Sequence, residues 1–423
     1  MTKHRKRGWL AAIATIAILG PLTGPGMAAP ESPPGGEWAA LTDGLRAADD
    51  HIQSRLPAGL TDQDRADIRL VELGALMSAY LVEAQSDPNH PYFVPEIGLY
   101  ENYFAPNPDT IYLRTAIDGA GSYVLQGRRG TVPIINLSVN YGPFLALTGK
   151  PVPHVDYDFD TLHFGPHGEF KVLLSGRRPN GYTGDWWYLD PRAQEVSTRS
   201  VSDDWGRQDD ARISIERVDI PPRGTPFPPG EVRRRMALLP GFVEHATLTL
   251  ANRAAQMESQ GWVNKATELP IVDIGGLTSQ HYFYSVVSFD PGEAVVLETD
   301  VPHHCRYWSV LLTTLVDSTI DWVNNQSSLN RNQARLDGDG KLRVVIADAD
   351  PGVPNWLDTV GRNKVGMQLR WTGCDSLPVP QLRRMPMSEV RHALPADTPI
   401  VTAAQRDQAL RLRSAAAQLR QQF

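Results

Sequence analysis

The sequence predicts an α+β protein that is mainly β, with β-sandwich or jelly-roll-like antiparallel sheets, an N-terminal helical hairpin and a linking central helix. About a dozen short segments alternate apolar and polar residues, and turn residues separate them at the spacing typical of all-β sheets. The predicted strands are not separated by helices of the length that a βαβ unit needs, which argues against a parallel α/β sheet. Helical patterns are confined to the start, the centre and the end of the chain.

The first 28 residues have the three parts of a secretory signal. Four basic residues precede an apolar run from Trp9 to Leu19, and small residues follow and end at Ala28. The run is shorter than the ~18 apolar residues that a membrane span needs. We therefore expect cleavage near Ala28 and a secreted or periplasmic protein without a stable membrane span, with an uncleaved anchor as the alternative.

The charge balance limits the partners of the chain. The 423 residues include 41 Lys and Arg against 48 Asp and Glu, and removal of the leader would leave 37 basic residues and a net charge of −11. This acidic balance argues against nucleic acid and anionic membrane surfaces as partners. We expect a small-molecule ligand, and the oligomeric state stays open.

The first half begins with helical patterns over 37–56 and 61–85, the predicted hairpin. In the second helix we expect a buried stripe formed by Leu70, Leu73, Met77, Tyr80 and Leu81. Short β segments follow a Pro-rich and aromatic path, and they are predicted at 111–116, 122–126, 132–139, 170–175, 185–189, 195–201 and 211–218.

The second half contains the central helix, further strands and a last helix, and the sequence shows no internal repeat of solenoid or propeller period. A Pro-rich linker at 221–229 precedes a helical pattern over 231–259, which Pro240-Gly241 should kink or divide. A last helix over 402–422 begins with a capping box formed by Thr402 and Gln405. Strands are predicted at 282–288, 294–299, 305–315, 341–347 and 364–371. The expected parts are a signal peptide (1–28), a helical hairpin with a β domain (29–220), a linker and helix (221–265), a C-terminal β-sandwich (266–396) and a C-terminal helix (397–423).

The chain has two cysteines, Cys305 and Cys374. In an exported protein they either form one disulfide or stay free. Two cysteines this far apart in sequence exclude zinc-ribbon and iron–sulfur sites. We assign the chain no cofactor and no metal.

Two stretches resemble an uncharacterised family of exported bacterial proteins. The segment Asn107 to Tyr112 (NPDTIY), followed by a strand, a turn and residues 123–131, is similar to an NPD-x-x-Y segment near the start of that family. Four further segments resemble the C-terminal block of that family, which is known as domain of unknown function 1214. They are Tyr307-Trp308, Asn324-Asn325, Asp350 to Leu357 (DPGVPNWL) and Arg370-Trp371. Domain of unknown function 1254 often precedes that block. The resemblance implies sandwich-like sheets with helices at the ends, and it carries no assigned activity or catalytic residue.

The strongest candidate site lies at the start of the first strand. The chain lacks the common nucleophile-elbow, zinc-protease, phosphate-loop and dinucleotide motifs, so an enzyme here would use carboxylates or histidines. Asn107 and Asp109 lie in a turn, and Tyr112 and Arg114 share one face of the next strand. The group either binds a polar ligand and supplies acid and base, or is a turn cap with an ion pair.

A second candidate is the aromatic strand that begins at Asp185. Trp186 and Trp187 face opposite ways on a strand, so one of them could stack on a sugar ring beside Asp185. The alternative is that both tryptophans are buried. A third stretch, His154 to Asp160, would place a histidine and three aspartates on one face, either for a divalent cation or as a solvated acidic face.

The last candidate is the long segment 348–363 between two predicted strands. Its length exceeds that of most structureless loops, which suggests a ligand-contacting role. Asn355 and Trp356 could reach Arg370, on the strand face opposite Trp371. The alternative is a structural plug held by Trp356.

These observations predict an exported protein that binds a small polar or sugar-like ligand between its two halves. As an enzyme it would be a carboxylate-based hydrolase or lyase, with Asp109 and Asp185 as acid and base. The substrate-binding residues would be Asn107, Tyr112, Arg114, Trp186, Asn355, Trp356 and Arg370. The alternative is a non-catalytic cell-envelope binding or assembly protein that uses exposed aromatic side chains.

Overall fold

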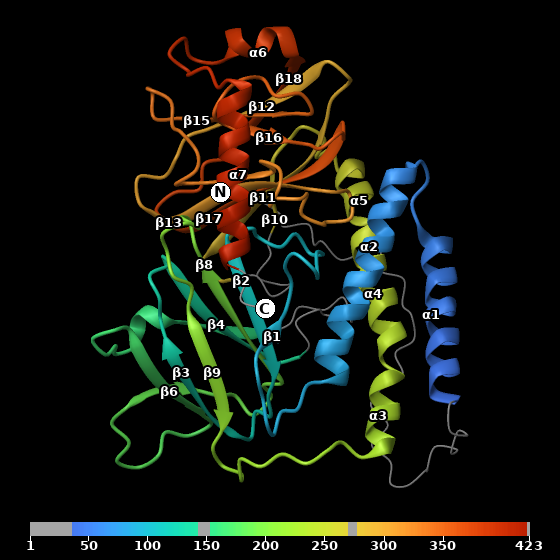
Figure 1. The fold of residues 1–423 in the computed structure, drawn as a ribbon, viewed down its shortest axis with the longest axis vertical. Coiled ribbons are helices and arrows are strands. Elements are labelled where there is room, and N and C mark those ends of the chain that lie inside the picture. Colours follow the sequence, from blue (N-terminus) through green and yellow to red (C-terminus); the bar gives the residue numbers. More distant parts are fainter. Residues whose placement is uncertain (1–35, 143–152, 270–276, 421–423) are drawn as a thin grey trace, which may run out of the picture.

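The computed structural model describes residues 36–142, 153–269 and 277–420, which form two β-sandwiches and a helical layer (Figure 1). The α+β, mainly β prediction is confirmed. The predicted leader, 1–28, lies outside the described residues. Within them, no helix has the length and apolar content to cross a membrane.

The first sandwich pairs a five-stranded sheet with a four-stranded one. All of its neighbouring strands are antiparallel except β6 and β7. The five-stranded sheet has the order β1 (Val94–Pro95), β2 (Thr110–Ala116), β8 (Glu195–Val201), β4 (Ile134–Asn140) and β5 (His154–Asp158). The four-stranded sheet has the order β7 (Asp185–Tyr188), β6 (Glu169–Ser175), β3 (Ser122–Arg128) and β9 (Arg212–Arg217).

The second sandwich repeats this topology strand for strand. Its five-stranded sheet has the order β10 (Thr267–Leu269), β11 (Gln280–Ser288), β17 (Lys364–Cys374), β13 (Cys305–Thr313) and β14 (Ser328–Asn330). Its four-stranded sheet has the order β16 (Trp356–Asp358), β15 (Leu342–Ala347), β12 (Glu293–Thr299) and β18 (Gln381–Pro386). Each strand of the first sandwich has its counterpart nine strands later, and the parallel pair β6 and β7 is matched by β15 and β16.

The two faces of each five-stranded sheet differ in chemistry. On β4, Ile135, Leu137 and Val139 point into the apolar core of the first sandwich, whereas Asn136 and Ser138 point to the opposite face. On β17, Met367, Leu369 and Trp371 enter the core of the second sandwich, and Gln368, Arg370 and Thr372 face the other way. These outward polar side chains are nevertheless buried.

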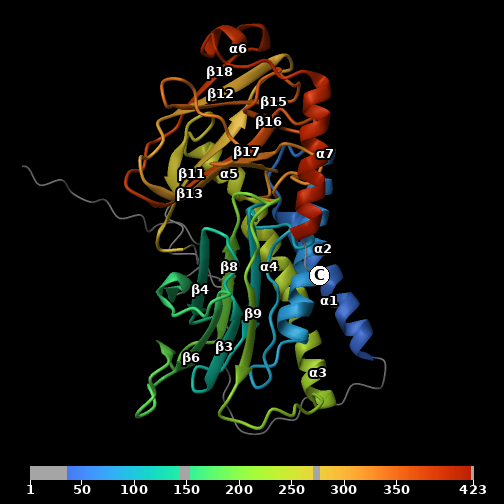
Figure 2. The ribbon, with the colours of Figure 1, turned by 60° about the vertical axis from the view of Figure 1, so that its left-hand side comes forward.

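Other parts of the chain cover the polar faces. Helix α2 (Asp62–Ala79) and segment 95–105 cover the polar face of the first sheet, where Ser78 Oγ donates to the backbone oxygen of Glu96. Helix α5 (Arg253–Ser259) covers the polar face of the second sheet, and Arg253 lies over the ring of Tyr284. The two sheets meet where β2 begins, since Asn107 Nδ2 donates to the hydroxyl of Tyr307 on β13 at 2.9 Å. Figure 2 shows the second sandwich above the first, with β13 near the upper end of β8.

The helical layer contains the predicted hairpin and the central helix. Both hairpin helices pack against α4, and the central pattern is divided into three helices. The helices of this layer are α1 (Gly36–Arg55), α2 (Asp62–Ala79, extended by a π-helical turn at Tyr80–Ala84), α3 (Pro229–Met236), α4 (Leu239–Ala251) and α5 (Arg253–Ser259).

The predicted buried stripe of α2 is wrong. Leu70 and Leu73 are 65% and 63% exposed, and Met77 and Tyr80 are exposed as well. The helix instead buries its neighbouring face, formed by Ile68, Val71, Ala75 and Ala79. The small residues on that face allow α2 to pack closely on α4 and on segment 100–102, and Gly74 lies against the latter.

The C-terminal helix spans both sandwiches. Helix α7 (Ala403–Arg420) begins with the predicted capping box of Thr402 and Gln405 and follows the short helix α6 (Met387–Ala393). Near its start, Arg406 Nε binds Asp350 of the second sandwich at 2.9 Å. At its end, Arg420 Nε binds Asp210 of the first sandwich at 2.8 Å. The helix therefore ties the two sandwiches together.

Strand pairing explains the placement of the two cysteines and of the segment 348–363. Cys305 and Cys374 face each other on β13 and β17, and the structure joins them in a disulfide. The segment 348–363 contains β16, a strand with no visible alternation, which pairs in parallel with β15. The strands that the sequence did not predict are short or lie at sheet edges, namely β1, β5, β10, β14, β16 and β18.

Candidate functional site

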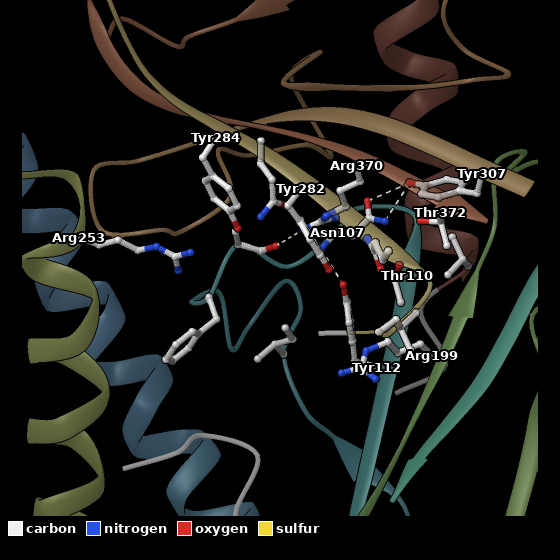
Figure 3. Close-up of a pocket in the computed structure, with 17 residues that line it drawn as sticks. Asn107, Thr110, Tyr112, Arg199, Arg253, Tyr282, Tyr284, Tyr307, Arg370 and Thr372 are labelled. Carbon is white, nitrogen blue, oxygen red and sulfur yellow. Dashed lines mark hydrogen bonds between the residues drawn. The ribbon is translucent and has the colours of Figure 1, made fainter. Parts of the chain in front are cut away.

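A cavity of about 70 Å³ lies where the two five-stranded sheets meet, and we call it the inter-sandwich cavity (Figure 3). A water molecule occupies ~30 Å³ in the liquid, so the cavity has room for a group the size of a carboxylate. Its polar walls come from both sandwiches and from α5: Asn107, Thr110, Tyr112, Arg199, Arg253, Gln280, Tyr282, Tyr284, Tyr307, Gln368, Arg370 and Thr372.

The same pair of side chains frames the cavity twice. Tyr112 of β2 lies opposite Arg199 of β8, and Tyr282 of β11 lies opposite Arg370 of β17. Because β11 and β17 are the counterparts of β2 and β8, the two tyrosine–arginine pairs occupy equivalent positions. The repeated topology therefore brings two guanidinium groups to one small cavity.

Arg370 is the most unusual group in the cavity. Its side chain is buried, with the residue 3% exposed, and Nη2 donates to the backbone oxygen of Ala105 at 2.7 Å. Nε and Nη1 have no hydrogen-bond partner among the described residues, and no ion pair there includes Arg370. The ring of Tyr282 lies 5.4 Å from the guanidinium carbon. A buried charge without an opposite charge costs several kcal/mol of stability.

The other two arginines of the cavity have polar contacts. Arg253 Nη1 lies 2.6 Å from Asp317 Oδ2, so its charge is balanced within the structure. Arg199 Nη1 donates to Ser138 Oγ at 2.6 Å. Arg370 differs from both, because two of its guanidinium nitrogens have no hydrogen-bond partner among the described residues and no carboxylate there forms an ion pair with it.

The tyrosines supply neutral hydrogen-bond donors. Burial raises the pKa of Tyr282 to about 12 and the pKa of Tyr307 well above its ordinary value. Burial raises the pKa of Tyr284 as well. These phenols stay protonated at neutral pH. Tyr282 and Tyr284 can therefore donate to an anionic oxygen without repelling it, whereas Tyr307 already donates its hydroxyl proton to Asp109.

Asp109 lies behind the cavity wall and orients Tyr307. Its carboxylate is buried and accepts hydrogen bonds from Trp205 Nε1 at 2.7 Å, from Asn330 Nδ2 at 2.8 Å and from the hydroxyl of Tyr307. Burial raises the pKa of Asp109, and these donors partly offset the rise. The phenol of Tyr307, rather than Asp109 itself, faces the cavity.

A second buried carboxylate, Glu96, lies in the polar layer beside the cavity residue Ile97. Neither of its oxygens has a hydrogen-bond partner among the described residues. Burial raises the pKa of Glu96 to about 7, and the nearby Arg199 and Arg114 oppose that rise. Arg114 itself binds Glu195 at 2.5 Å.

The chain is similar in structure to a putative uncharacterized protein from Burkholderia cenocepacia, with a TM-score of 0.77 and 25% sequence identity. The likeness covers 84% of this chain and 98% of the other. The VPA0106 protein from Vibrio parahaemolyticus aligns with a TM-score of 0.42 and 13% identity, over 75% of this chain and 98% of its own. No family model and no curated protein matches the chain. The first likeness supports the architecture, and the resemblance to domain of unknown function 1214 stays a prediction.

The structure brings several of the predicted site residues together. Asn107, Tyr112 and Arg370 line the inter-sandwich cavity. Asp109 contacts it through Tyr307. Arg114 points to the same sheet face but lies deeper in the polar layer, in its ion pair with Glu195.

The other predicted residues lie elsewhere. Asp185 is on β7, in the four-stranded sheet of the first sandwich, where its Oδ1 lies 2.7 Å from His163 Nδ1. The expected pairing of Asp109 with Asp185 therefore does not form, because the two residues belong to different sheets. Trp186 Nε1 donates to Ser175 Oγ at 3.0 Å.

The segment 348–363 does not reach Arg370. It lies beside the four-stranded sheet of the second sandwich, where Asn355 Nδ2 donates to the backbone oxygens of Arg335 and Arg343. Trp356 is buried, and its Nε1 donates to the backbone oxygen of Ala347 at 2.9 Å. The segment forms a structural plug, the alternative that the sequence left open.

The acidic stretch from His154 to Asp160 makes ion pairs and hydrogen bonds. Arg306 binds both Asp158 and Asp160, and Asp156 accepts from Ser138 and Thr278. Over the described ranges, no group of three or more potential ligands is arranged to hold a metal ion.

The sequence did not point to Arg199, Tyr282, Tyr307 or Gln368. Each lies on the polar face of an alternating strand, and such a face is usually exposed to water. The run from Gln368 to Thr372 gave the only available signal, since it places an arginine between two other polar residues on one face of a long strand.

Proposed function

We propose that this protein is an exported binding protein for a small polar ligand that carries a carboxylate or a similar oxyanion, held in the inter-sandwich cavity. One observation carries the proposal. Arg370 is buried, faces the cavity and has two guanidinium nitrogens without a partner among the described residues. A bound oxyanion would supply the missing charge and the missing acceptors together.

The surroundings of Arg370 fit this ligand. Tyr282 and Tyr284 offer neutral hydroxyl donors, and Gln368 and Asn107 add amides. The volume of about 70 Å³ admits one carboxylate and excludes a whole sugar ring. Among the sugar-like ligands that the sequence predicted, this proposal includes sugar acids, because they could place a carboxylate in the cavity.

If the ligand is also transformed, the residues support proton abstraction beside a carboxylate, as in a lyase. Arg370 would balance the charge of the ligand, and Tyr307 would accept the proton as its own proton passes to Asp109. A two-carboxylate glycosidase has less support, because Asp109 and Asp185 lie in different sheets.

The alternative of a non-catalytic envelope assembly protein rests on exposed aromatic side chains. Trp356 does not serve it, since the residue is 6% exposed. Trp186 is half-buried and bonded to Ser175. The cavity therefore supports ligand binding better than a partner surface made by these tryptophans.

Titration calorimetry tests the proposal. It would measure the binding of acetate, phosphate, sulfate and glucose to wild type and to Arg370→Met. We expect saturable binding of acetate by wild type, a loss of at least tenfold in affinity in Arg370→Met, and no binding of glucose. The control is Arg411→Met, which replaces an exposed arginine on α7. Equal acetate affinity in wild type and Arg370→Met would contradict the proposal.

A further inference from the structure

A second hollow, larger and more apolar, lies beside the inter-sandwich cavity, and we call it the apolar groove. It has a volume of about 290 Å³ and is formed by α2, segment 95–101, the start of β2 and the end of α7. Its apolar walls include Met77, Leu99, Tyr100, Trp322 and Ala417.

The apolar groove offers little charge to a ligand. Its lining contains one basic and one acidic residue. The basic one, Arg420, is neutralised by its ion pair with Asp210. The other, Glu101, is buried, and burial raises its pKa. The walls therefore favour a hydrocarbon group over a polar one.

The groove and the cavity share part of their walls. Ile97, Thr110 and Tyr112 line both, so the two spaces adjoin at these residues. Tyr112 is half-buried, and its hydroxyl accepts one long hydrogen bond of 3.2 Å from the backbone of Asn107. A modest change in the Tyr112 side chain would join the groove to the cavity.

An exposed apolar surface leads to the groove. Met77 and Tyr100 line the groove and are also exposed to solvent. Leu73 and Leu70 continue the exposed stripe along α2. Contiguous exposed apolar surface marks a binding route more often than chance exposure does.

We propose that the ligand is an amphiphilic carboxylic acid, whose carboxylate binds Arg370 and whose hydrocarbon tail occupies the apolar groove. This inference rests on the proposed function, because it takes the carboxylate site as given and adds the tail. The shared wall and the contrast in charge between the two spaces support it. A cavity of ~150 Å³ accommodates benzene, so the groove has room for a tail of about ten carbon atoms.

A chain-length series tests the inference. Titration calorimetry would compare acetate, hexanoate, decanoate and the neutral decanol, all below their aggregation concentrations. For wild type we expect the affinity to rise roughly threefold to fourfold for each added methylene up to about ten carbon atoms. We expect decanol to bind at least tenfold more weakly than decanoate, because it lacks the charge that Arg370 balances.

Two variants locate the tail. Ala417→Leu narrows the groove without touching the cavity, and Ala415→Leu makes the same change at an exposed position of α7. We expect Ala417→Leu to weaken decanoate binding at least tenfold and leave acetate binding unchanged, with no effect from Ala415→Leu. If Ala417→Leu does not fold, Met77→Glu adds a repelling charge at the exposed end of the groove. Its control is Leu419→Glu, at an exposed position of α7 that lines neither the groove nor the cavity.

The outcomes separate this inference from the proposed function. Acetate binding without a gain in affinity from acetate to decanoate would overturn the inference and leave the proposed function standing. Failure of both acids to bind would overturn both. Equal binding of decanoate and decanol, or an Ala417→Leu protein that binds decanoate as wild type does, would also contradict the placement of the ligand.

Discussion

Arg370 and Trp371 are neighbours on β17, and they face opposite sides of one sheet. Trp371 is 0% exposed in the core of the second sandwich, where it packs edge to face with Trp308 and donates from Nε1 to the backbone oxygen of Pro378 at 3.1 Å. Arg370 is almost as buried but lacks an opposite charge in the described structure. One face of the sheet therefore stabilises the fold, while the other has an unbalanced charge that a ligand can offset.

The same contrast holds for both sandwiches. Several buried polar atoms without a partner among the described residues lie on the polar faces of the two five-stranded sheets, such as those of Asn136, Asn140, Ser309, Gln368 and Arg370. The opposite faces are closed by side chains such as Leu137 and Leu369. Native proteins bury few unpaired polar groups, so their concentration in one layer marks that layer as a place for a ligand or water.

The largest expected effect is that of Trp371→Ala, on the apolar face. Removing this side chain should lower the free energy of unfolding by about 3–5 kcal/mol, because it opens a cavity in the core of the second sandwich. Urea unfolding followed by circular dichroism measures this change. A loss below about 1 kcal/mol would contradict the claim that the apolar face of β17 stabilises the fold.

Trp356→Ala should have the next largest effect, about 3–4 kcal/mol. Trp356 packs inside the structural plug and does not line the inter-sandwich cavity. We therefore expect the acetate affinity of the folded variant to equal that of wild type. An unchanged free energy of unfolding with lost acetate binding would reverse the roles given to the two regions.

Glu96→Gln tests whether a buried carboxylate in the polar layer makes the free energy of unfolding depend on pH. The pKa of Glu96 is about 7 in the folded state and about 4.5 in the unfolded chain. As the pH rises through this window, the unfolded state releases the proton first, so the wild-type free energy of unfolding falls by up to about 3 kcal/mol. Glu96→Gln should be more stable than wild type by about that amount at pH 8 and similar to it near pH 4.5.

Urea unfolding of both proteins at pH 4.5 and pH 8 measures this difference. The groups that face Glu96 in the polar layer are Arg114, Glu195 and Arg199, and they are unchanged in the variant. The same dependence on pH in wild type and Glu96→Gln would show that the burial of Glu96 does not set it.

Asp109→Asn should have the smallest effect on stability, about 1–2 kcal/mol, because the amide keeps one acceptor for Trp205 and Asn330. The hydroxyl of Tyr307 would lose its anionic acceptor. Acetate affinity should change by less than threefold, since Asp109 does not line the cavity. A tenfold loss of affinity would contradict this prediction and show that Asp109 contributes to ligand binding, directly or through Tyr307.

The sequence predicted the long strands because each alternates, and alternation places apolar residues on one face whatever lies beyond. It could not show that the polar face of β17 meets another part of the chain instead of water. The pairing of Asp109 with Asp185 failed for a related reason, since sheet order decides which strands are neighbours. For α2, two stripes of apolar residues were available, and close packing against α4 selected the one with small side chains.

The repeat of the two sandwiches was hidden for a physical reason as well. Strand order and register repeat, but a sandwich core accepts many combinations of apolar residues, so the residues themselves need not. The tyrosine–arginine pairs, Tyr112 with Arg199 and Tyr282 with Arg370, do recur at equivalent positions, but they lie far apart in the sequence.

The central claim is that Arg370 lowers stability until an oxyanion binds beside it. The most direct test is the free energy of unfolding of wild type and Arg370→Met, each with saturating sodium acetate and with sodium chloride at equal ionic strength. We predict that acetate stabilises wild type only, and that Arg370→Met in chloride is at least as stable as wild type in chloride, because an apolar group replaces an unbalanced charge. An Arg370→Met protein that is less stable than wild type in chloride and still gains stability from acetate would contradict the claim.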